Sequence, residues 1–182
     1  MRGIHHVIVQ NGNLKYEFDI RRNLTILKGN SASGKTTLVE MIQEYIVNGP
    51  DSGVNLSCDV PCRVLTGDLW KEQLSNAENA IVFIDEGNRF IKTAEFAKAI
   101  QNTSNYYVIA TRESLEMLPI SVDEIYGIKS SGKYGSLTPV YHEFYHIYHL
   151  EEKEKYPICP GKIIVEDSNS GYEFFQSNKG HA

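Results

Sequence analysis

The chain has 182 residues, a length that suits one domain with a proper core and a short appendage. Its 41% hydrophobic and 23% charged residues are ordinary for a globular protein, and its net charge of −5 argues against bulk attraction to nucleic acid or anionic membranes. Apolar runs are no longer than a strand, and the N-terminus lacks the apolar stretch of a signal peptide, so we expect a cytoplasmic protein that spans no membrane.

Two local features qualify this picture. Three basic residues lie close together in the sequence: Arg21, Arg22 and Lys28. A local basic patch is therefore not excluded by the net charge, and binding of nucleic acid stays an open alternative. Cys58 and Cys62 are the close pair among three cysteines. Two thiols fall short of the four ligands of a structural zinc site, so we expect reduced thiols in a cytosolic protein.

The first predicted elements are a hairpin and a strand that leads into a loop. Residues 4–9 and 14–20 have strand patterns on either side of an Asn-Gly dipeptide, a strong signal for a two-residue hairpin turn. Residues 24–27 form a short apolar run rich in β-branched side chains. Apolar residues recur at helical spacing after Thr36, so the loop lies between a strand and a helix.

This loop fits the phosphate-binding pattern G-x-x-x-x-G-K-[ST], the P-loop. Gly29 and Gly34 permit backbone conformations closed to other residues, so that consecutive N–H groups converge on a phosphate at the helix N-terminus. We expect Lys35 to reach the β- and γ-phosphates and the Thr36 hydroxyl to hold Mg²⁺. The sequence therefore predicts binding of ATP with Mg²⁺. The residues expected to bind the nucleotide are Gly29, Asn30, Ser31, Ala32, Ser33, Gly34, Lys35, Thr36 and Thr37.

Strand and helix patterns then alternate along the chain. Strand patterns occupy residues 62–65, 80–84 and 106–110, and helical patterns occupy residues 69–74 and 93–100. This alternation predicts an α/β fold, a parallel P-loop NTPase sheet flanked by helices, with an N-terminal β-hairpin and extra C-terminal strands. Ligands in such sheets bind where the strands end.

The C-terminal third gives weaker signals. Residues 124–129 have a strand pattern, whereas residues 141–150 fit both a helical stripe of aromatic side chains and a strand. His142 and His146 have the spacing of two metal ligands on a helix, but a half-exposed element packed through its aromatic side chains is the favoured interpretation. Residues 162–165 form one last strand pattern, and a helix is expected to follow.

A second motif completes the predicted site. Four apolar residues run into Asp85-Glu86, the Walker B pattern, at a spacing from the P-loop that admits one intervening strand and helix. Asp85 is expected to hold Mg²⁺ through its water shell beside Thr36. Glu86 is expected to orient and deprotonate the attacking water, a role worth about 10²–10⁴-fold in rate.

The third strand of the predicted site ends in Thr111-Arg112. Thr111 is expected to hydrogen-bond the attacking water or the γ-phosphate. Two interpretations of Arg112 stay open: it senses phosphate charge, or it forms a surface ion pair with Glu113 or Glu116. Since no arginine finger is evident in cis, we expect slow turnover that rises when a second copy or another protein approaches the site.

Together these motifs resemble the ATP-hydrolysing P-loop proteins with an added catalytic glutamate, and most closely the ABC/SMC-type ATPase heads. The resemblance covers about residues 1–135 and is carried by residues 23–38, 81–86, 107–112 and 123–128. It implies an ATPase whose hydrolysis switches a partner or an attached domain. Three departures mark a compact relative. Too few residues lie between the first predicted helix and Walker B for the family's helical subdomain, no Leu-Ser-Gly-Gly-like signature occurs, and Arg112 stands where the family has histidine.

The tail carries a second resemblance. Residues 163–166 with the turn and helix pattern after them resemble the opening of a Toprim domain, as in the overcoming-lysogenization-defect nucleases, which join such a domain to an ABC-like ATPase. The expected organisation is a P-loop ATPase domain over residues 1–150. Residues 151–182 are then a linker followed by the start of a Toprim-like domain or by a tail.

Two other functions remain open at this stage. A small-molecule kinase fits the chain length, and type II thymidine kinases likewise pair a P-loop with Asp-Glu and a nearby phenylalanine, as Asp85, Glu86 and Phe90 do here. The second open function is that of a regulatory module that binds ATP and barely hydrolyses it. The favoured function is that of an ATPase.

Overall fold

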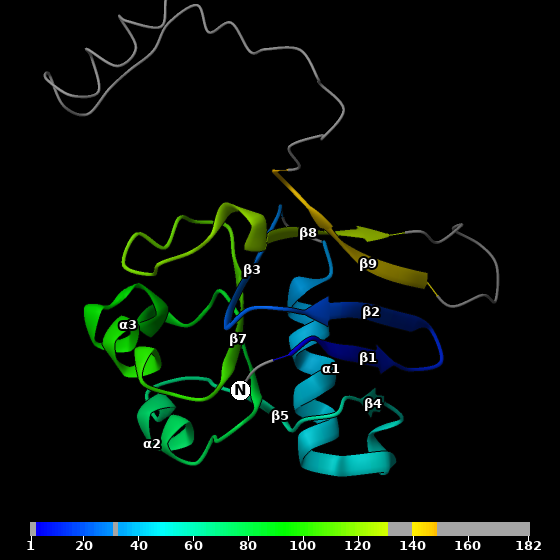
Figure 1. The fold of residues 1–182 in the computed structure, drawn as a ribbon. Helices are drawn as coiled ribbons and strands as arrows, with labels where there is room; N and C mark the ends of the chain where they lie inside the picture. Colours follow the sequence, from blue (N-terminus) through cyan, green and yellow to red (C-terminus); the bar gives the residue numbers. More distant parts are fainter. Residues whose placement is uncertain (1–2, 31–32, 131–139, 149–182) are drawn as a thin grey trace, which may run out of the picture. The chain divides into compact units, whose positions relative to one another are not determined.

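The computed structural model of the protein describes residues 3–30, 33–130 and 140–148 (Figure 1). Strands in these ranges are β1 (His5–Gln10), β2 (Leu14–Ile20), β3 (Leu24–Lys28), β4 (Asn55–Ser57), β5 (Cys62–Val64), β6 (Ile81–Ile84), β7 (Tyr106–Thr111), β8 (Ile125–Ser130) and β9 (Val140–His146). The α-helices there are α1 (Lys35–Asn48), α2 (Trp70–Ser75) and α3 (Ala94–Gln101), and the 3₁₀ turns are η1 (Gly49–Ser52), η2 (Arg89–Lys92) and η3 (Val122–Glu124).

All the described strands belong to one sheet, in the order β4-β1-β2-β9-β8-β3-β7-β6-β5. The five neighbours β8, β3, β7, β6 and β5 run parallel to one another. On the other side, β1 is antiparallel to both β2 and β4. Strand β9 lies between these two parts, parallel to β2 and antiparallel to β8.

The predicted fold class, a parallel P-loop NTPase sheet flanked by helices with an N-terminal hairpin and extra C-terminal strands, is therefore wrong. The described residues form a mixed nine-stranded sheet, curved as a half-barrel, with few helices. The alternation of strand and helix patterns predicted parallel neighbours. It could not reveal that β9 joins the hairpin to the rest of the sheet, because that pairing links residues more than a hundred positions apart.

Both faces of the sheet are covered where the strands are most apolar. In β6, Ile81 and Phe83 belong to a core with α1, whereas Val82 and Ile84 belong to a core with α2 and α3. Figure 1 shows α1 on the opposite side of β7 from α2 and α3. A strand buried on both faces reads as a continuous apolar run, which explains the patterns of β6 and β7.

The hairpin and the ambiguous segment both have simple outcomes. Strands β1 and β2 pair as predicted, and the Asn11 side chain accepts hydrogen bonds from the backbone of Asn13 and Leu14 in the turn. Residues 140–146 are a strand, so the helical alternative is wrong.

The predicted linker, Toprim-like start and domain division at residue 150 lie outside the described residues. In the described part of the chain, no helix is long and apolar enough to cross a membrane.

Candidate functional site

The predicted phosphate loop connects β3 to α1. Strand β3 ends at Lys28 and α1 begins at Lys35, directly after Gly34. Gly34 has φ 85°, in the left-handed region that favours glycine, and a Cβ there would meet the Tyr16 hydroxyl at 2.9 Å. Both requirements explain why glycine occupies this position. Two of the predicted loop residues, Ser31 and Ala32, lie outside the described residues.

Lys35 points back into the loop. Its Nζ donates hydrogen bonds to the carbonyl oxygens of Gly29 and Asn30, at 2.8 Å and 3.0 Å, and to Ser33 Oγ at 3.0 Å. The residue is 4% exposed, and burial lowers the pKa of the Lys35 ammonium, while Glu86 and Asp85 oppose that shift. Three donors directed into the loop give this ammonium a fixed place where a bound phosphate would need it.

The two predicted Mg²⁺ ligands are brought together. Thr36 Oγ1 donates a hydrogen bond to Asp85 Oδ1 at 3.3 Å, although the residues are 49 positions apart. A hydroxyl and a carboxylate are the oxygen ligands that Mg²⁺ accepts, and the ion commonly keeps waters and needs one or two carboxylates beside substrate phosphates. No cluster of three or more His, Cys, Asp or Glu side chains suited to a metal occurs among the described residues, and such a Mg²⁺ site requires none.

Glu86 and Arg112 form a two-pronged ion pair. Arg112 Nη2 lies 2.7 Å from Glu86 Oε1, and Arg112 Nε donates to Glu86 Oε2 at 3.1 Å. The carboxylate predicted to deprotonate water is thus held by both its oxygens. Arg112 thus forms a surface ion pair, but its partner in the described part of the chain is Glu86 and neither of the predicted partners, Glu113 or Glu116. Glu113 pairs with Lys92.

Thr111 is near the other predicted residues but is turned toward its own chain. Strands β3, β7 and β6 are parallel neighbours, and Lys28 pairs with Thr111, so the strand ends meet at one edge of the sheet. Thr111 Oγ1 accepts a hydrogen bond from Glu113 N at 3.1 Å and donates to Glu113 O at 3.3 Å. This hydroxyl shapes the turn after β7, and its predicted contact with water or phosphate stays a prediction.

Two residues support the loop in a way that the sequence did not predict. The Tyr16 hydroxyl donates to the Gly34 carbonyl at 3.0 Å, and the His142 ring stacks on the Tyr16 ring with 4.6 Å between centroids. His142 is 9% exposed, its Nδ1 has no hydrogen-bond partner among the residues that the structure describes, and burial lowers the pKa of its imidazole. The alternating pattern of β2 pointed Tyr16 inward, whereas nothing local signalled that His142 would pair with it across β2 and β9.

No family model matches the chain, and none of the curated proteins compared with it matches it. The resemblances to ATPase heads and to a Toprim opening therefore stay predictions. The described residues offer an arrangement of side chains: a buried lysine at the start of α1 that donates to the loop before it, a hydroxyl against a carboxylate, and a glutamate held by an arginine.

Proposed function

We propose that the chain binds a nucleoside triphosphate with Mg²⁺ and hydrolyses it, so that hydrolysis switches a partner protein, a second copy or an attached domain. The observation that carries the proposal is the contact of Thr36 with Asp85. These two residues come from the start of α1 and the end of β6, and they would be the protein ligands of Mg²⁺. Held by these two residues, Mg²⁺ would supply positive charge against the negative charge that develops in phosphoryl transfer.

Lys35 supplies the second support. Its ammonium already faces the space bounded by the loop, where carbonyl oxygens of Gly29 and Asn30 accept its hydrogen bonds. Phosphate oxygens are stronger acceptors for an ammonium, because they carry negative charge. Lys35 would exchange its loop partners for the β- and γ-phosphates with little rearrangement, and the helix N-terminus beside it favours the same charge.

Glu86 favours hydrolysis over transfer to an organic acceptor, because a carboxylate one position after the Mg²⁺ ligand is suited to taking a proton from water. Its ion pair with Arg112 engages both carboxylate oxygens, so Arg112 competes with a water molecule for the same two oxygens. Turnover should therefore be slow until Arg112 moves to another anion. A γ-phosphate or an acidic group on a partner would provide one.

The binding claim is tested by thermal and urea unfolding with Mg-ATP. At a ligand concentration a hundred times the dissociation constant, binding should add about 2.7 kcal/mol to the free energy of unfolding. Lys35→Ala should abolish this gain, because it removes the charge beside the phosphates. Lys98→Ala is the matched control, since Lys98 is exposed on α3, and it should keep the gain. An unchanged unfolding curve for wild type with Mg-ATP would rule the proposal out.

The chemical roles are separated by two isosteric changes. Glu86→Gln should leave nucleotide binding intact and lower phosphate release by ~10²-fold or more, because an amide cannot accept the proton. Asp85→Asn should weaken the Mg²⁺-dependent part of binding itself. Glu72→Gln, an exposed change on α2, serves as the control and should alter neither quantity. Wild-type phosphate release in both site variants would contradict the assignment.

A further inference from the structure

A pair of thiols meets at the turn between β4 and β5, away from the candidate nucleotide site. Cys58 directly follows β4 and Cys62 opens β5. Ser57 is paired with Ile8 of β1, and Cys62 with Ile81 of β6, so the sheet holds both ends of the turn. Both cysteines are free thiols, and both line a pocket of about 330 Å³.

The two cysteines line the same pocket and have opposite environments. Cys62 is 5% exposed, whereas Cys58 is half-buried and therefore reachable from solvent. A hydrogen bond from Cys62 is the main cause that lowers the pKa of the Cys58 thiol to about 7. The same contact, together with burial, raises the pKa of Cys62. Cys58 is thus the thiolate near neutral pH, and Cys62 the thiol that stabilises it.

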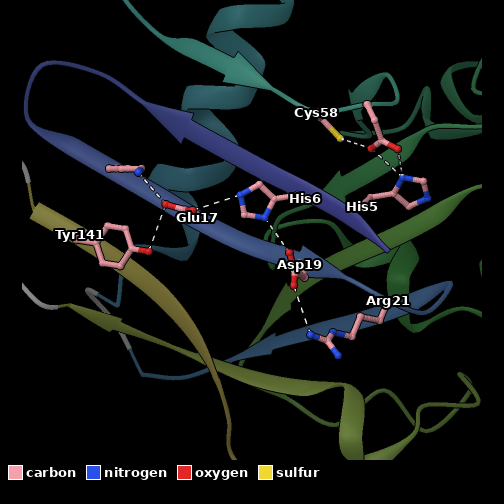
Figure 2. A network of polar contacts seen from close by, with 9 residues as sticks. His5, His6, Glu17, Asp19, Arg21, Cys58 and Tyr141 are labelled. Atoms are coloured by element: carbon pink, nitrogen blue, oxygen red, sulfur yellow. Dashed lines mark hydrogen bonds and ion pairs between the residues drawn. The ribbon is translucent and has the colours of Figure 1, made fainter. Parts of the chain in front are cut away.

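The groups around Cys58 add opposing effects. Asp59 Oδ1 lies 3.6 Å from Cys58 Sγ and disfavours a thiolate there. Both oxygens of this carboxylate lie 2.9 Å from Nδ1 of the buried His5 (Figure 2). This contact with His5 weakens the repulsion between the carboxylate and a thiolate at Cys58. The titratable and charged groups that border the pair are His5, Tyr45, Asp59 and Arg63.

We propose that Cys58 and Cys62 form a reversible dithiol–disulfide centre, in which Cys58 attacks and Cys62 resolves, with a low-molecular-weight disulfide such as glutathione disulfide as the oxidant. The position of both cysteines in one pocket, their unequal exposure and their fixed backbone ends carry this inference. It is independent of the proposed nucleotide site, and either can fail without the other.

The exchange balances without any further reagent. The Cys58 thiolate bonds to one sulfur of the oxidant, whose S–S bond breaks, and the departing thiolate takes a proton from water. Cys62 then gives its proton to solvent and attacks Cys58 Sγ, so that the mixed disulfide breaks and a second small thiol leaves. Two protein thiols are oxidised and one small disulfide is reduced to two thiols. Excess small thiol reverses both steps.

The experiment uses the full chain with Cys159→Ser, so that the third cysteine of the sequence does not react. The protein is equilibrated with glutathione disulfide, its remaining thiols are capped with a maleimide, and intact mass and peptide masses are measured. We expect both thiols to be lost, a peptide cross-linked between Cys58 and Cys62, and no bound glutathione. Glutathione bound without the cross-link, or two thiols that stay free, would overturn the proposal. Because Cys58 and Cys62 are both unmutated in this experiment, a folding defect caused by their replacement cannot explain either result.

Single replacements in the same background assign the two roles. Cys62→Ser should leave one glutathione bound stably to Cys58, because no resolving thiol remains. Cys58→Ser should bind little glutathione, since Cys62 is buried. The reverse outcome, with Cys62 reacting first, contradicts the roles.

The pH dependence of Cys58 alkylation by iodoacetamide gives a second readout. With Cys62 present, the rate should rise with a midpoint near pH 7. With Cys62→Ala, the midpoint should move up toward the ordinary thiol value of about 8.5, because the donor to the thiolate is lost. An unmoved midpoint would show that Cys62 does not stabilise the thiolate.

Discussion

The two parts of the sheet are built on different principles. We call β8, β3, β7, β6 and β5 the parallel half, and β4, β1, β2 and β9 the mixed half. Strands β6 and β7 are buried along their whole length, whereas β1 alternates between buried and more exposed positions. One half is therefore packed on both faces, and the other has a core on one face and solvent on the other.

The solvent face of the mixed half carries a network of polar side chains (Figure 2). His6 Nδ1 lies 2.8 Å from Asp19 Oδ1, and Lys15 Nζ lies 2.7 Å from Glu17 Oε2. Ion pairs this accessible to water are screened and add little to stability. From this difference between the halves we expect substitutions of packed aromatic side chains to lower the free energy of unfolding more than substitutions in the polar network.

The largest expected effect tests this difference directly. Phe96 of α3 is fully buried among Trp70, Phe90 and Tyr107, so Phe96→Ala should lower the free energy of unfolding by about 3–5 kcal/mol. Phe144 of β9 stacks on Phe18 but is only half-buried, and Phe144→Ala should cost clearly less. Urea unfolding measures both. Equal losses would erase the proposed distinction between the halves.

Sequence reasoning served the parallel half best, because its information is local. The apolar run before Asp85 and the glycine-bounded loop before Lys35 each mark a strand end without knowledge of any neighbour. Parallel pairing then brings those ends to one edge, which is why Thr36 and Asp85 meet as expected. The predicted fold class was wrong because β9 joins the hairpin to the parallel strands in one mixed sheet that has few helices.

The remaining misses are all long-range. The pairing of Tyr16 with His142 connects β2 to β9. Arg112 pairs with Glu86, whereas the sequence suggested only its near neighbours Glu113 and Glu116 as partners. Hydrophobic periodicity identifies which face of a strand is buried but carries no information on which strand lies beside it. Strand order and cross-strand partners therefore needed the structure.

A smaller effect is expected where the mixed half supports the phosphate loop. Tyr16→Phe removes the hydrogen bond to the Gly34 carbonyl and should lower the free energy of unfolding by about 0.5–1.5 kcal/mol. It should also reduce the stabilisation by Mg-ATP, by less than Lys35→Ala does, because the loop loses a support and not a phosphate ligand. Tyr126→Phe in β8 is the matched control. A silent Tyr16→Phe in both assays would mean that the two halves are not coupled through Gly34.

The smallest effect separates the two faces of the mixed half by the sign of a pH dependence. Burial lowers the pKa of His142 below its ordinary value of 6.5, so the unfolded chain takes up a proton more readily, and the histidine's contribution to stability is present above pH 6.5 and lost as pH falls below it. Asp19 raises the pKa of the exposed His6, so the contribution of His6 to stability is present below pH 6.5 and lost as pH rises.

His142→Phe keeps the stacking on Tyr16 and cannot titrate, and His6→Phe likewise removes only one titrating group. In urea unfolding between pH 5 and 8, the difference between wild type and His142→Phe should shift against wild type as the pH falls, and the difference for His6→Phe should shift the other way. Shifts of the same sign would contradict the assignment of one buried and one solvent face, because only burial on one side and a carboxylate on the other can move two imidazoles in opposite directions.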